Sequence, residues 1–382
     1  MRFWEAIDYK NARKVLVIPN ITNSSNIEKD SFIDVIYNHI KALDNYGEYY
    51  WNVLVPKGNV TKKLNSLPKN NVKQIEIHIP GDMMNQRAFP SVDLIKVLTD
   101  TEYDVIYSHL PDWVQVGRYA KWGTKIVGYS HWFEFDKHLP CNGVDRRDGK
   151  AKWLWGPIEL LGILQMETCY LNTQDQKNRV LAEAKEIFND ELITKLDNIL
   201  TVWNLGVEKS KIVDKPSENK EKVIVFNHRP AAYKGYPRFI ELMVEYYTHR
   251  QDFKVWIPQL SGKVPHSWID NTKVPKHEYY QRLQGCMVGV QMRQTNFGWS
   301  VSGSDVMMNG TPMVWQESDC YREIDPNGIF WKTKKEFFEI LDKILDDESY
   351  RKELELKSIE RAKELSTNED KMIKELHNKL VN

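Results

Sequence analysis

The sequence predicts an α/β protein of two domains, each with a mainly parallel β-sheet. Apolar segments typical of strands alternate with stretches of helical periodicity, and this alternation starts again after a polar segment near the middle of the chain. The length of the chain also predicts two domains, because 382 residues are more than one ordinary hydrophobic core accommodates. The polar segment, residues 210–222, contains Pro216 and is interpreted as the linker. Two such domains would leave a cleft between them where the carboxyl ends of their strands meet, and open α/β sheets bind ligands at those ends.

The first domain is expected to open with a strand at residues 14–20 that runs into a polar turn. An amphipathic helix should follow at residues 30–43, where apolar side chains recur at helical spacing. Further apolar runs predict strands at residues 51–56, 73–80, 104–109 and 125–131.

The second half repeats the pattern. Strands are predicted at residues 223–228, 253–258, 288–293, 311–316 and 328–331. Helices are predicted at residues 236–248, 279–285 and 304–309. The last residues of the chain, about 50 of them, combine many charges with apolar residues at helical spacing and predict C-terminal helices.

Composition limits the classes of protein. Lys plus Arg equals Asp plus Glu, 53 each, so nucleic acid would have to be bound by a local basic patch. The four cysteines lie far apart without a Cys-x-x-Cys pair, which is typical of buried thiols in a reducing compartment. The sequence shows neither a long apolar run nor a signal-peptide pattern. We therefore expect a cytoplasmic protein without stable membrane insertion.

A loop at the start of the second half carries two cations. The strand predicted at residues 223–228 is followed by Arg229, Lys234 and Gly235, and then by a helix. A guanidinium, an ammonium and the free N–H groups of a helix start can together bind a diphosphate. A solvated loop with incidental charges remains the alternative.

A second stretch, residues 295–315, places Asp305 ahead of two methionines and shortly before Gly310-Thr311-Pro312. A carboxylate at the start of a short helix can bind ligand hydroxyl groups. It can also merely cap the helix.

These two stretches resemble motifs of the retaining GT-B glycosyltransferases of the family-4 type. Arg229, Lys234 and Gly235 resemble the Arg-x4-Lys-Gly motif of that family. Residues 295–314 resemble its Glu-x7-Glu signature followed by Gly-Thr-Pro, with Asp305 for the second Glu and Thr295 for the first. The resemblance implies two Rossmann-like domains facing across a cleft, with the C-terminal helices packing back. Residues 1–208 would bind the acceptor and residues 209–382 the nucleotide-sugar.

The resemblance also implies roles for individual residues. Arg229 and Lys234 would stabilise the leaving diphosphate, and Asp305 would accept hydrogen bonds from the ribose. Other donor contacts would come from Ser24, Phe297, Gly298, Trp299 and Ser300. His131, at the end of a strand, would contact the sugar or the acceptor. Retention would come from front-face attack, without a protein base.

No metal is expected to be required. No Asp-x-Asp motif follows a predicted strand, and Asp346-Asp347 are expected on a helix surface. The two loop cations would take the place of the metal, and the co-substrate would be a nucleotide-sugar, most simply a UDP-sugar.

The acceptor is predicted from a looser resemblance to the T-even phage DNA α-glucosyltransferases. Basic and aromatic residues are interleaved after His131, which suits phosphates and an exposed base. The predicted DNA contacts are Trp132, Arg146, Arg147, Lys150, Lys152 and Trp153. The partner would be double-stranded DNA with a hydroxymethylated pyrimidine. Three alternatives stay open: transfer to a cell-surface glycan or lipid-linked acceptor, a non-catalytic nucleotide-sugar-binding protein, and a sugar-nucleotide epimerase.

Overall fold

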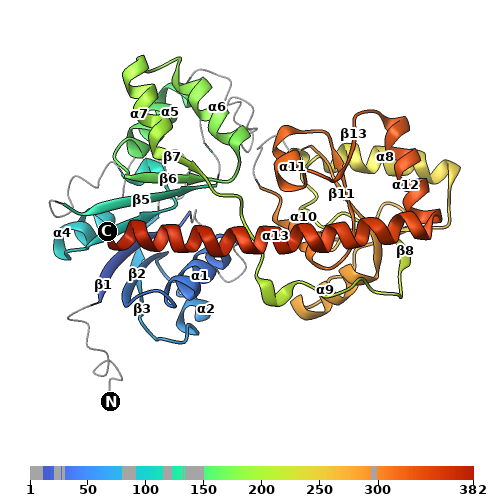
Figure 1. Cartoon of the computed structure of the whole chain (residues 1–382), viewed down its shortest axis with the longest axis horizontal. Helices are drawn as coiled ribbons and strands as arrows, with labels where there is room; N and C mark the ends of the chain where they lie inside the picture. The colour runs from blue at the N-terminus through green and yellow to red at the C-terminus, as the bar shows by residue number, and fades with distance from the viewer. Residues whose placement is uncertain are drawn as a thin grey trace. The chain divides into compact units, whose positions relative to one another are not determined.

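The protein forms two compact units in a computed structural model (Figure 1). The structure describes residues 12–20, 27, 31–79, 92–114, 123–131, 133, 150–293 and 299–382, without the side chains of residues 31, 32 and 150–155. Unit 1 comprises Met1–Leu171, Lys177–Trp203 and Lys371–Asn382, and unit 2 comprises Asn172–Gln176 and Asn204–Asp370. Compared with the expected limits of 1–208 and 209–382, the main change of unit comes at residue 204, and residues 371–382 belong to unit 1.

Unit 1 is built on a parallel sheet, as predicted. Among the described residues the sheet has seven strands in the order β3-β2-β1-β4-β5-β6-β7. The strands are β1 (Arg13–Ile18), β2 (Tyr49–Pro56), β3 (Val72–Ile77), β4 (Val105–Ser108), β5 (Lys125–Ser130), β6 (Thr168–Leu171) and β7 (Leu200–Val202). The helices are α1 (Ser31–Leu43), α2 (Lys62–Asn65), α4 (Val92–Asp100), α5 (Lys150–Ile163), α6 (Gln174–Ala184) and α7 (Asp190–Ile199).

Alternation along β1 divides the unit 1 core between the two faces of the sheet. Leu16 and Ile18 pack in one cluster with apolar residues of α4, α5, α6 and α7. Val15 and Val17, also fully buried, face the other side because successive strand residues point in opposite directions. Helix α1 covers that side, since its His39 contacts the rings of Tyr107 and Tyr129. The sheet is therefore buried on both faces, as expected for parallel strands.

Unit 2 holds a second parallel sheet. In the described part of the chain it has six strands in the order β10-β9-β8-β11-β12-β13. The strands are β8 (Glu221–Val225), β9 (Lys254–Trp256), β10 (Ile269–Asp270), β11 (Cys286–Gln291), β12 (Met313–Gln316) and β13 (Ile329–Trp331). The helices are α8 (Tyr236–His249), α9 (Lys276–Gly285), α10 (Val301–Met308), α11 (Asp319–Ile324), α12 (Lys334–Asp346) and α13 (Glu348–Val381). Two short 3-10 turns, η3 (Lys209–Lys211) and η4 (Ala232–Lys234), complete the unit.

Helices α8 and α12 cover one face of this sheet. Phe239 and Leu242 of α8 and Phe337 and Leu341 of α12 join the core cluster of the strands. A capping box fixes the start of α12, because the Thr333 side chain and Glu336 satisfy each other's backbone N–H groups. The predicted two-sheet α/β architecture with C-terminal helices is thus confirmed.

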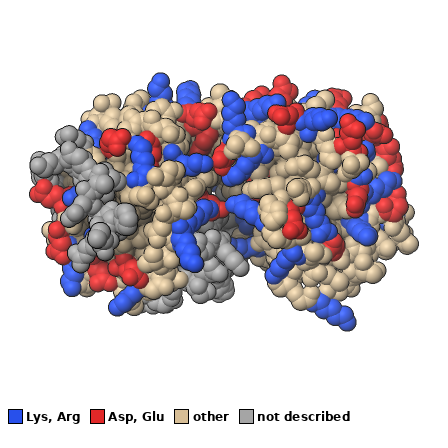
Figure 2. All heavy atoms as spheres, turned by 90° about the horizontal axis from the view of Figure 1, so that it is seen from below, with Lys and Arg blue, Asp and Glu red and all other residues tan. Residues whose placement is uncertain are grey.

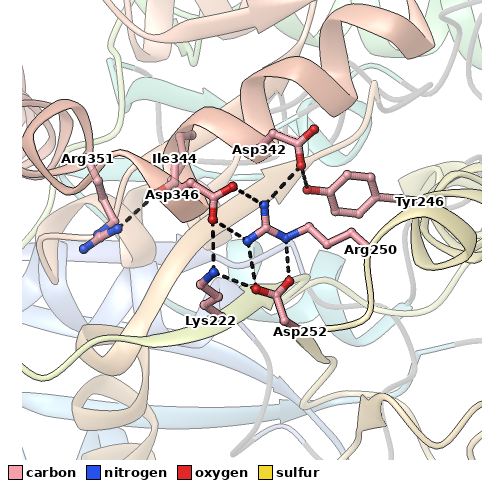
Figure 3. Close-up of polar contacts among 8 residues, drawn as sticks. All are labelled: Lys222, Tyr246, Arg250, Asp252, Asp342, Ile344, Asp346 and Arg351. Carbon is pink, nitrogen blue, oxygen red and sulfur yellow. Dashed lines mark hydrogen bonds and ion pairs between the residues drawn. The ribbon is translucent and has the colours of Figure 1, made fainter.

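The amino edge of the unit 2 sheet carries a network of paired charges, drawn in Figure 3. The guanidinium of Arg250 donates to Asp346 at 2.6 Å through both Nη atoms, to Asp342 at 3.2 Å and to Asp252 at 2.6 Å. The ammonium of Lys222 joins Asp252 at 2.6 Å and Asp346 at 3.0 Å. Asp346 thus lies on the surface of the C-terminal helical region, as predicted, and it binds cationic side chains.

Charge is mixed on the molecular surface. On the face shown in Figure 2, Lys and Arg are interspersed with Asp and Glu, in keeping with a formal net charge of +0. Within the described ranges, no helix is both long enough and apolar enough to cross a membrane.

Candidate functional site

Strand order places a candidate site at the carboxyl edge of the unit 2 sheet. From β8 the chain proceeds to β9 and β10 on one side, whereas β11, β12 and β13 follow on the other. The order therefore reverses between the neighbouring strands β8 and β11. In open α/β sheets this switch point opens a crevice at the carboxyl ends of the strands. The residues after β8 and β11 are thus the first candidates for ligand contact.

The chain after β8 delivers two cations to this edge. Asn227 and His228 are buried, whereas Arg229 is exposed and Lys234 is half-buried at the end of η4. Gly235 directly precedes α8 with a φ of 74°, and a side chain there would collide with Met292. Glycine is required on both grounds.

No side chain caps α8. Pro237 has no N–H, and the N–H groups of Tyr236 and Phe239 donate to the carbonyls of Ala231 at 3.4 Å and Gly235 at 2.9 Å, so in this turn only the Arg238 N–H is left for an anion.

The two cations differ in their surroundings. Burial, with a smaller effect of neighbouring Arg229, lowers the pKa of Lys234 to about 8. The Arg229 side chain forms no ion pair within the part of the chain that the structure describes. The two cations therefore lie close enough to interact, and a bound anion would relieve the repulsion between them.

A hydrogen-bond hub at Gln291 joins the ends of β8 and β11 to α10. His228 donates from Nε2 to Gln291 Oε1, and Ser300 Oγ donates to the same oxygen at 2.6 Å. Ser300 also accepts from the Gly303 N–H at 3.1 Å and so caps α10. Burial, followed by nearby Lys234, lowers the pKa of His228 to about 3. His228 is therefore a neutral donor that positions the loop, and the N-terminus of α10 is held at the same edge.

Asp305 lies one turn inside α10, which begins at Val301 and not at residue 304 as predicted. The cap is Ser300, so the alternative that Asp305 caps the helix is wrong. The Tyr279 hydroxyl donates to Asp305 Oδ2 across 3.5 Å. Burial raises the pKa of Asp305 to about 7, although Lys276 and Lys211 lie close enough to oppose this shift. A carboxylate held at this cost is a candidate for ligand binding.

Asn227 connects three of these elements. Its Nδ2 donates to the Tyr279 hydroxyl at 2.8 Å and to the Ser302 carbonyl at 2.9 Å. The end of β8 is therefore tied to α9 and to the first turn of α10, which fixes the backbone around Asp305. Asn227, Tyr279 and Gln291 were not predicted as site residues, because nothing in their local sequence distinguishes them from core polar residues.

The Gly310-Thr311-Pro312 segment has a structural role. Gly310, two residues after the end of α10, has a φ of 68°, and Thr311 Oγ1 donates to the carbonyl of Leu283 at 2.7 Å. The buried Lys220 ammonium donates to the Gly310 carbonyl at 3.0 Å and lies 3.6 Å from Glu355 of α13. The segment thus anchors α10 to its neighbours.

Several predicted donor contacts cannot be placed. Ser24, Phe297 and Gly298 lie outside the described residues. Trp299 is buried, and its Nε1 donates to Ser304 Oγ at 3.2 Å. Trp299 and Ser300 therefore shape the start of α10 through contacts inside unit 2.

The predicted acceptor residues are described only in part. Three of them lie outside the described residues: Trp132, Arg146 and Arg147. The structure gives only the backbone, in the first turns of α5, for the other three: Lys150, Lys152 and Trp153.

His131 directly follows β5 in unit 1 and is buried. Its Nε2 lies 3.0 Å from Nδ1 of His109, which directly follows β4. Burial, followed by the influence of His39, lowers the pKa of His131 to about 3. His39 and His109 were not predicted as partners, because they are distant in sequence.

Comparisons with known proteins support the architecture. No protein-family model matches the sequence, and no curated protein matches it. The structure is similar to sucrose-phosphate synthase from Thermosynechococcus elongatus, with a TM-score of 0.69, 12% identity, and 96% of this chain and 99% of that chain covered. HepE of Anabaena in complex with UDP and glucose gives a TM-score of 0.65, 11% identity and coverage of 96% and 99%.

A trehalose-6-phosphate synthase, studied for glycosyl transfer with retention, gives a TM-score of 0.66, 11% identity and coverage of 96% and 99%. These likenesses extend over both units. The chain has the GT-B fold.

Proposed function

We propose that the protein is a glycosyltransferase that takes its sugar from a nucleotide diphosphate sugar, with a UDP-sugar as donor. The observation that carries this proposal is the cation pair Arg229 and Lys234 beside the uncapped start of α8, at the switch point of the unit 2 sheet. Asp305 adds a carboxylate suited to ribose hydroxyl groups. Among the neighbours, HepE was solved with UDP and glucose, which supports this choice of donor.

Charge explains the reaction that such a site can promote. Breaking the bond between the anomeric carbon and the phosphate leaves an oxocarbenium-like sugar and a diphosphate of growing negative charge. Arg229 and Lys234 would stabilise that charge most strongly in the transition state. Attack from the same face would give retention. The similar trehalose-6-phosphate synthase, which was studied for glycosyl transfer with retention, supports this stereochemistry. On unit 1, His131 is proposed to contact the transferred sugar or the acceptor.

The donor reaction can be tested without an acceptor. Slow hydrolysis of UDP-glucose and other UDP-sugars, followed by chromatography of released UDP, should be measurable with the wild type. Arg229→Ala should reduce the rate by about tenfold to a hundredfold, because a charge-assisted contact is worth roughly 1.5–3 kcal/mol. Arg238→Ala is the matched control, since Arg238 is an exposed cation of α8 paired with Glu241 at 2.7 Å. Equal rates in both variants would remove the clamp from the proposal, and a wild type without hydrolysis or UDP binding would favour a non-catalytic role.

For the acceptor, double-stranded DNA with hydroxymethylated pyrimidines stays our proposal, with the reaction taking place in the cytoplasm. It rests on the basic and aromatic residues at positions 132, 146, 147, 150, 152 and 153, whose side chains the structure does not describe. The three neighbours, by contrast, are named for sugar phosphates or were solved with UDP and glucose. A soluble sugar phosphate and a surface glycan are the competing acceptors.

Mass spectrometry of nucleosides from hydroxymethylated DNA, after incubation with a panel of UDP-sugars, tests this choice. Replacing Arg146 and Arg147 by Ala should weaken duplex binding and flatten its salt dependence by about 0.9 per lost phosphate contact. Donor hydrolysis should stay at the wild-type rate. DNA that remains unmodified, together with product from glucose 6-phosphate, would move the proposal to a sugar-phosphate acceptor.

A further inference from the structure

The carboxylate of Asp305 lies at the end of a short chain of hydrogen bonds in unit 2. Asn227 Nδ2 donates to the hydroxyl of Tyr279 at 2.8 Å, and that hydroxyl lies 3.5 Å from Asp305 Oδ2. The ring of Tyr279, in α9, packs against two other rings, with centroid distances of 5.8 Å to Trp256 and 5.4 Å to Tyr280. The end of β8, helix α9 and helix α10 therefore meet around this carboxylate.

The direction of donation along this chain is fixed by its first member. The amide nitrogen of Asn227 also donates to the carbonyl of Ser302 at 2.9 Å, and a carbonyl can only accept, so the orientation of the amide is determined. The Tyr279 oxygen accordingly accepts from Asn227 and keeps its own proton for another acceptor. Burial, followed by the charge of Asp305, raises the pKa of Tyr279 well above its usual value, so the hydroxyl is protonated at neutral pH. Within the described residues, the acceptor of that proton is Asp305 Oδ2.

The second carboxylate oxygen of Asp305 is not used by the protein. Asp305 is half-buried, and in the part of the chain that the structure describes its Oδ1 forms no hydrogen bond or ion pair. The charged and titratable groups that face this carboxylate are Lys276, Tyr279 and Tyr280 of α9 and Lys211 of η3. Oδ2 is thus held by Tyr279, whereas Oδ1 is left to pair with a hydroxyl group of a ligand.

We propose that Tyr279 is a positioning residue for the ribose of the donor. Its hydroxyl, directed by Asn227, holds Oδ2 of Asp305 and supports the charged carboxylate, so that Oδ1 accepts from the ribose hydroxyl groups. The separation of 3.5 Å is long for a hydrogen bond between a hydroxyl and a carboxylate, so its effect belongs at the lower end of the range for one hydrogen bond, about threefold in affinity. The hydrogen-bond chain follows from unit 2 alone, whereas its use for a ribose rests on the proposed function.

The ionisation of Asp305 can be followed in the full-length protein without any ligand. Carbon-13 NMR of protein labelled at its aspartate carboxyl carbons reports the titration, and the Asp305 signal is identified by its loss in Asp305→Asn. The wild-type signal should titrate with a pKa of about 7. In Tyr279→Phe the titration should move to higher pH, because a donor to the charged form is removed. Tyr280→Phe is the matched control, since Tyr280 also faces Asp305 but its hydroxyl forms no hydrogen bond within the described ranges, and it should leave the titration in place. An Asp305 titration that Tyr279→Phe does not move would overturn the proposal.

The role of the ribose is tested by comparing UDP with 2′,3′-dideoxy-UDP, which carries the same base and phosphates, so that the titration of Lys234 and of the phosphates cancels in the ratio of affinities. Calorimetric titration of the wild type should show a preference for UDP that grows as the pH rises through the pKa of Asp305 and reaches about tenfold. In Tyr279→Phe the preference at pH 7 should be about threefold smaller, with the affinity for the dideoxy nucleotide unchanged, and Tyr280→Phe should match the wild type. A full preference for UDP at pH 7 in Tyr279→Phe would contradict the positioning role. A wild type that binds neither nucleotide, although the Asp305 titration moves as expected, would contradict only the proposed function.

Discussion

The two edges of the unit 2 sheet hold charge in opposite ways. At the amino edge, Arg250 and Lys222 are paired with Asp252, Asp342 and Asp346 in one network (Figure 3). At the carboxyl edge, Arg229 and Lys234 lie together in one loop. The first edge brings unlike charges into contact, whereas the second brings like charges together.

The pKa shifts follow this difference. Hydrogen bonds from Arg250 hold the pKa of Asp346 below its usual value, and hydrogen bonds to Asp346 raise the pKa of Arg250. At the carboxyl edge, burial lowers the pKa of Lys234 to about 8 and raises that of Asp305 to about 7. Groups whose pKa shifts favour the ionised form stabilise the fold, whereas groups whose ionised form is disfavoured by burial are candidates for ligand binding. Variants at the two edges should therefore fail in different assays.

The largest effect is expected for Lys234→Met, which keeps the apolar stem and removes the charge. UDP affinity should fall by about tenfold to a hundredfold, because a charge-assisted contact to phosphate is lost. The free energy of unfolding near pH 7 should stay the same or rise, since the folded state no longer holds a buried ammonium. Calorimetric titration and urea unfolding measure the two quantities, and a large loss of stability would make Lys234 a structural residue.

Asp305→Asn should separate function from stability in a pH-dependent way. Donor affinity should fall by about tenfold, as expected for charge-assisted hydrogen bonds to the ribose. Because the folded pKa of Asp305 is raised, its ionisation costs the folded state stability as the pH rises from about 4 to about 7. The variant should therefore unfold at higher urea concentration than the wild type near pH 8 and at the same concentration near pH 4. If the difference in urea concentration at unfolding between the variant and the wild type does not change with pH, burial does not raise the pKa of Asp305.

Arg250→Ala should show the reverse pattern. Its side chain is 13% exposed, but its carboxylate partners are more than half exposed, so solvent screens the network. The free energy of unfolding should fall by about 1–2 kcal/mol, and UDP affinity should not change. Arg238→Ala is the control for a single exposed pair and should cost less than about 0.5 kcal/mol. Weakened UDP binding in Arg250→Ala would show that the two edges are not independent.

A smaller effect is expected from proton uptake. Near pH 8.5 much of Lys234 is neutral in the protein without UDP, and a bound diphosphate would favour its ammonium form. UDP binding should therefore take up a fraction of a proton, which appears as a dependence of the calorimetric enthalpy on the ionisation enthalpy of the buffer. Lys234→Arg should abolish that dependence, because arginine stays charged. Equal enthalpies in all buffers for the wild type would place the pKa of Lys234 away from the working range.

No effect is expected from chelation. The described residues contain no group of His, Cys, Asp and Glu that could hold a metal ion, and Arg229 and Lys234 would supply the positive charge in its place. EDTA should leave the rate of UDP-glucose hydrolysis unchanged. Loss of the rate, with recovery on adding magnesium or manganese, would show that the cations are insufficient.

The periodicity of the sequence predicted the architecture because parallel strands leave long apolar runs. It missed β6, β7 and β10, whose short segments give little signal. The start of α10 was misplaced because Gly303 is a weak helix former, and Ser300 became visible as the cap only in the structure.

Site residues that are close together in the sequence could be predicted from local motifs. Residues that come together only through contacts between distant elements could not. Arg229 and Lys234 are close in sequence and were recognised together. Asn227 and Tyr279 meet through a contact between β8 and α9, and His109 meets His131 only through the pairing of β4 with β5. Such partners are set by strand order, which no local pattern encodes.

The central claim is that the carboxyl edge of the unit 2 sheet binds the diphosphate of a nucleotide. Calorimetric titration of the wild type and of the Arg229→Ala, Lys234→Met double variant with UDP and with uridine tests it most directly. The wild type should bind UDP more tightly than uridine by about a hundredfold or more, since two charge-assisted contacts go to the phosphates. In the double variant the preference for UDP should shrink to within about tenfold while uridine binding stays the same. A preference that survives in the double variant would place the phosphates elsewhere and contradict the account.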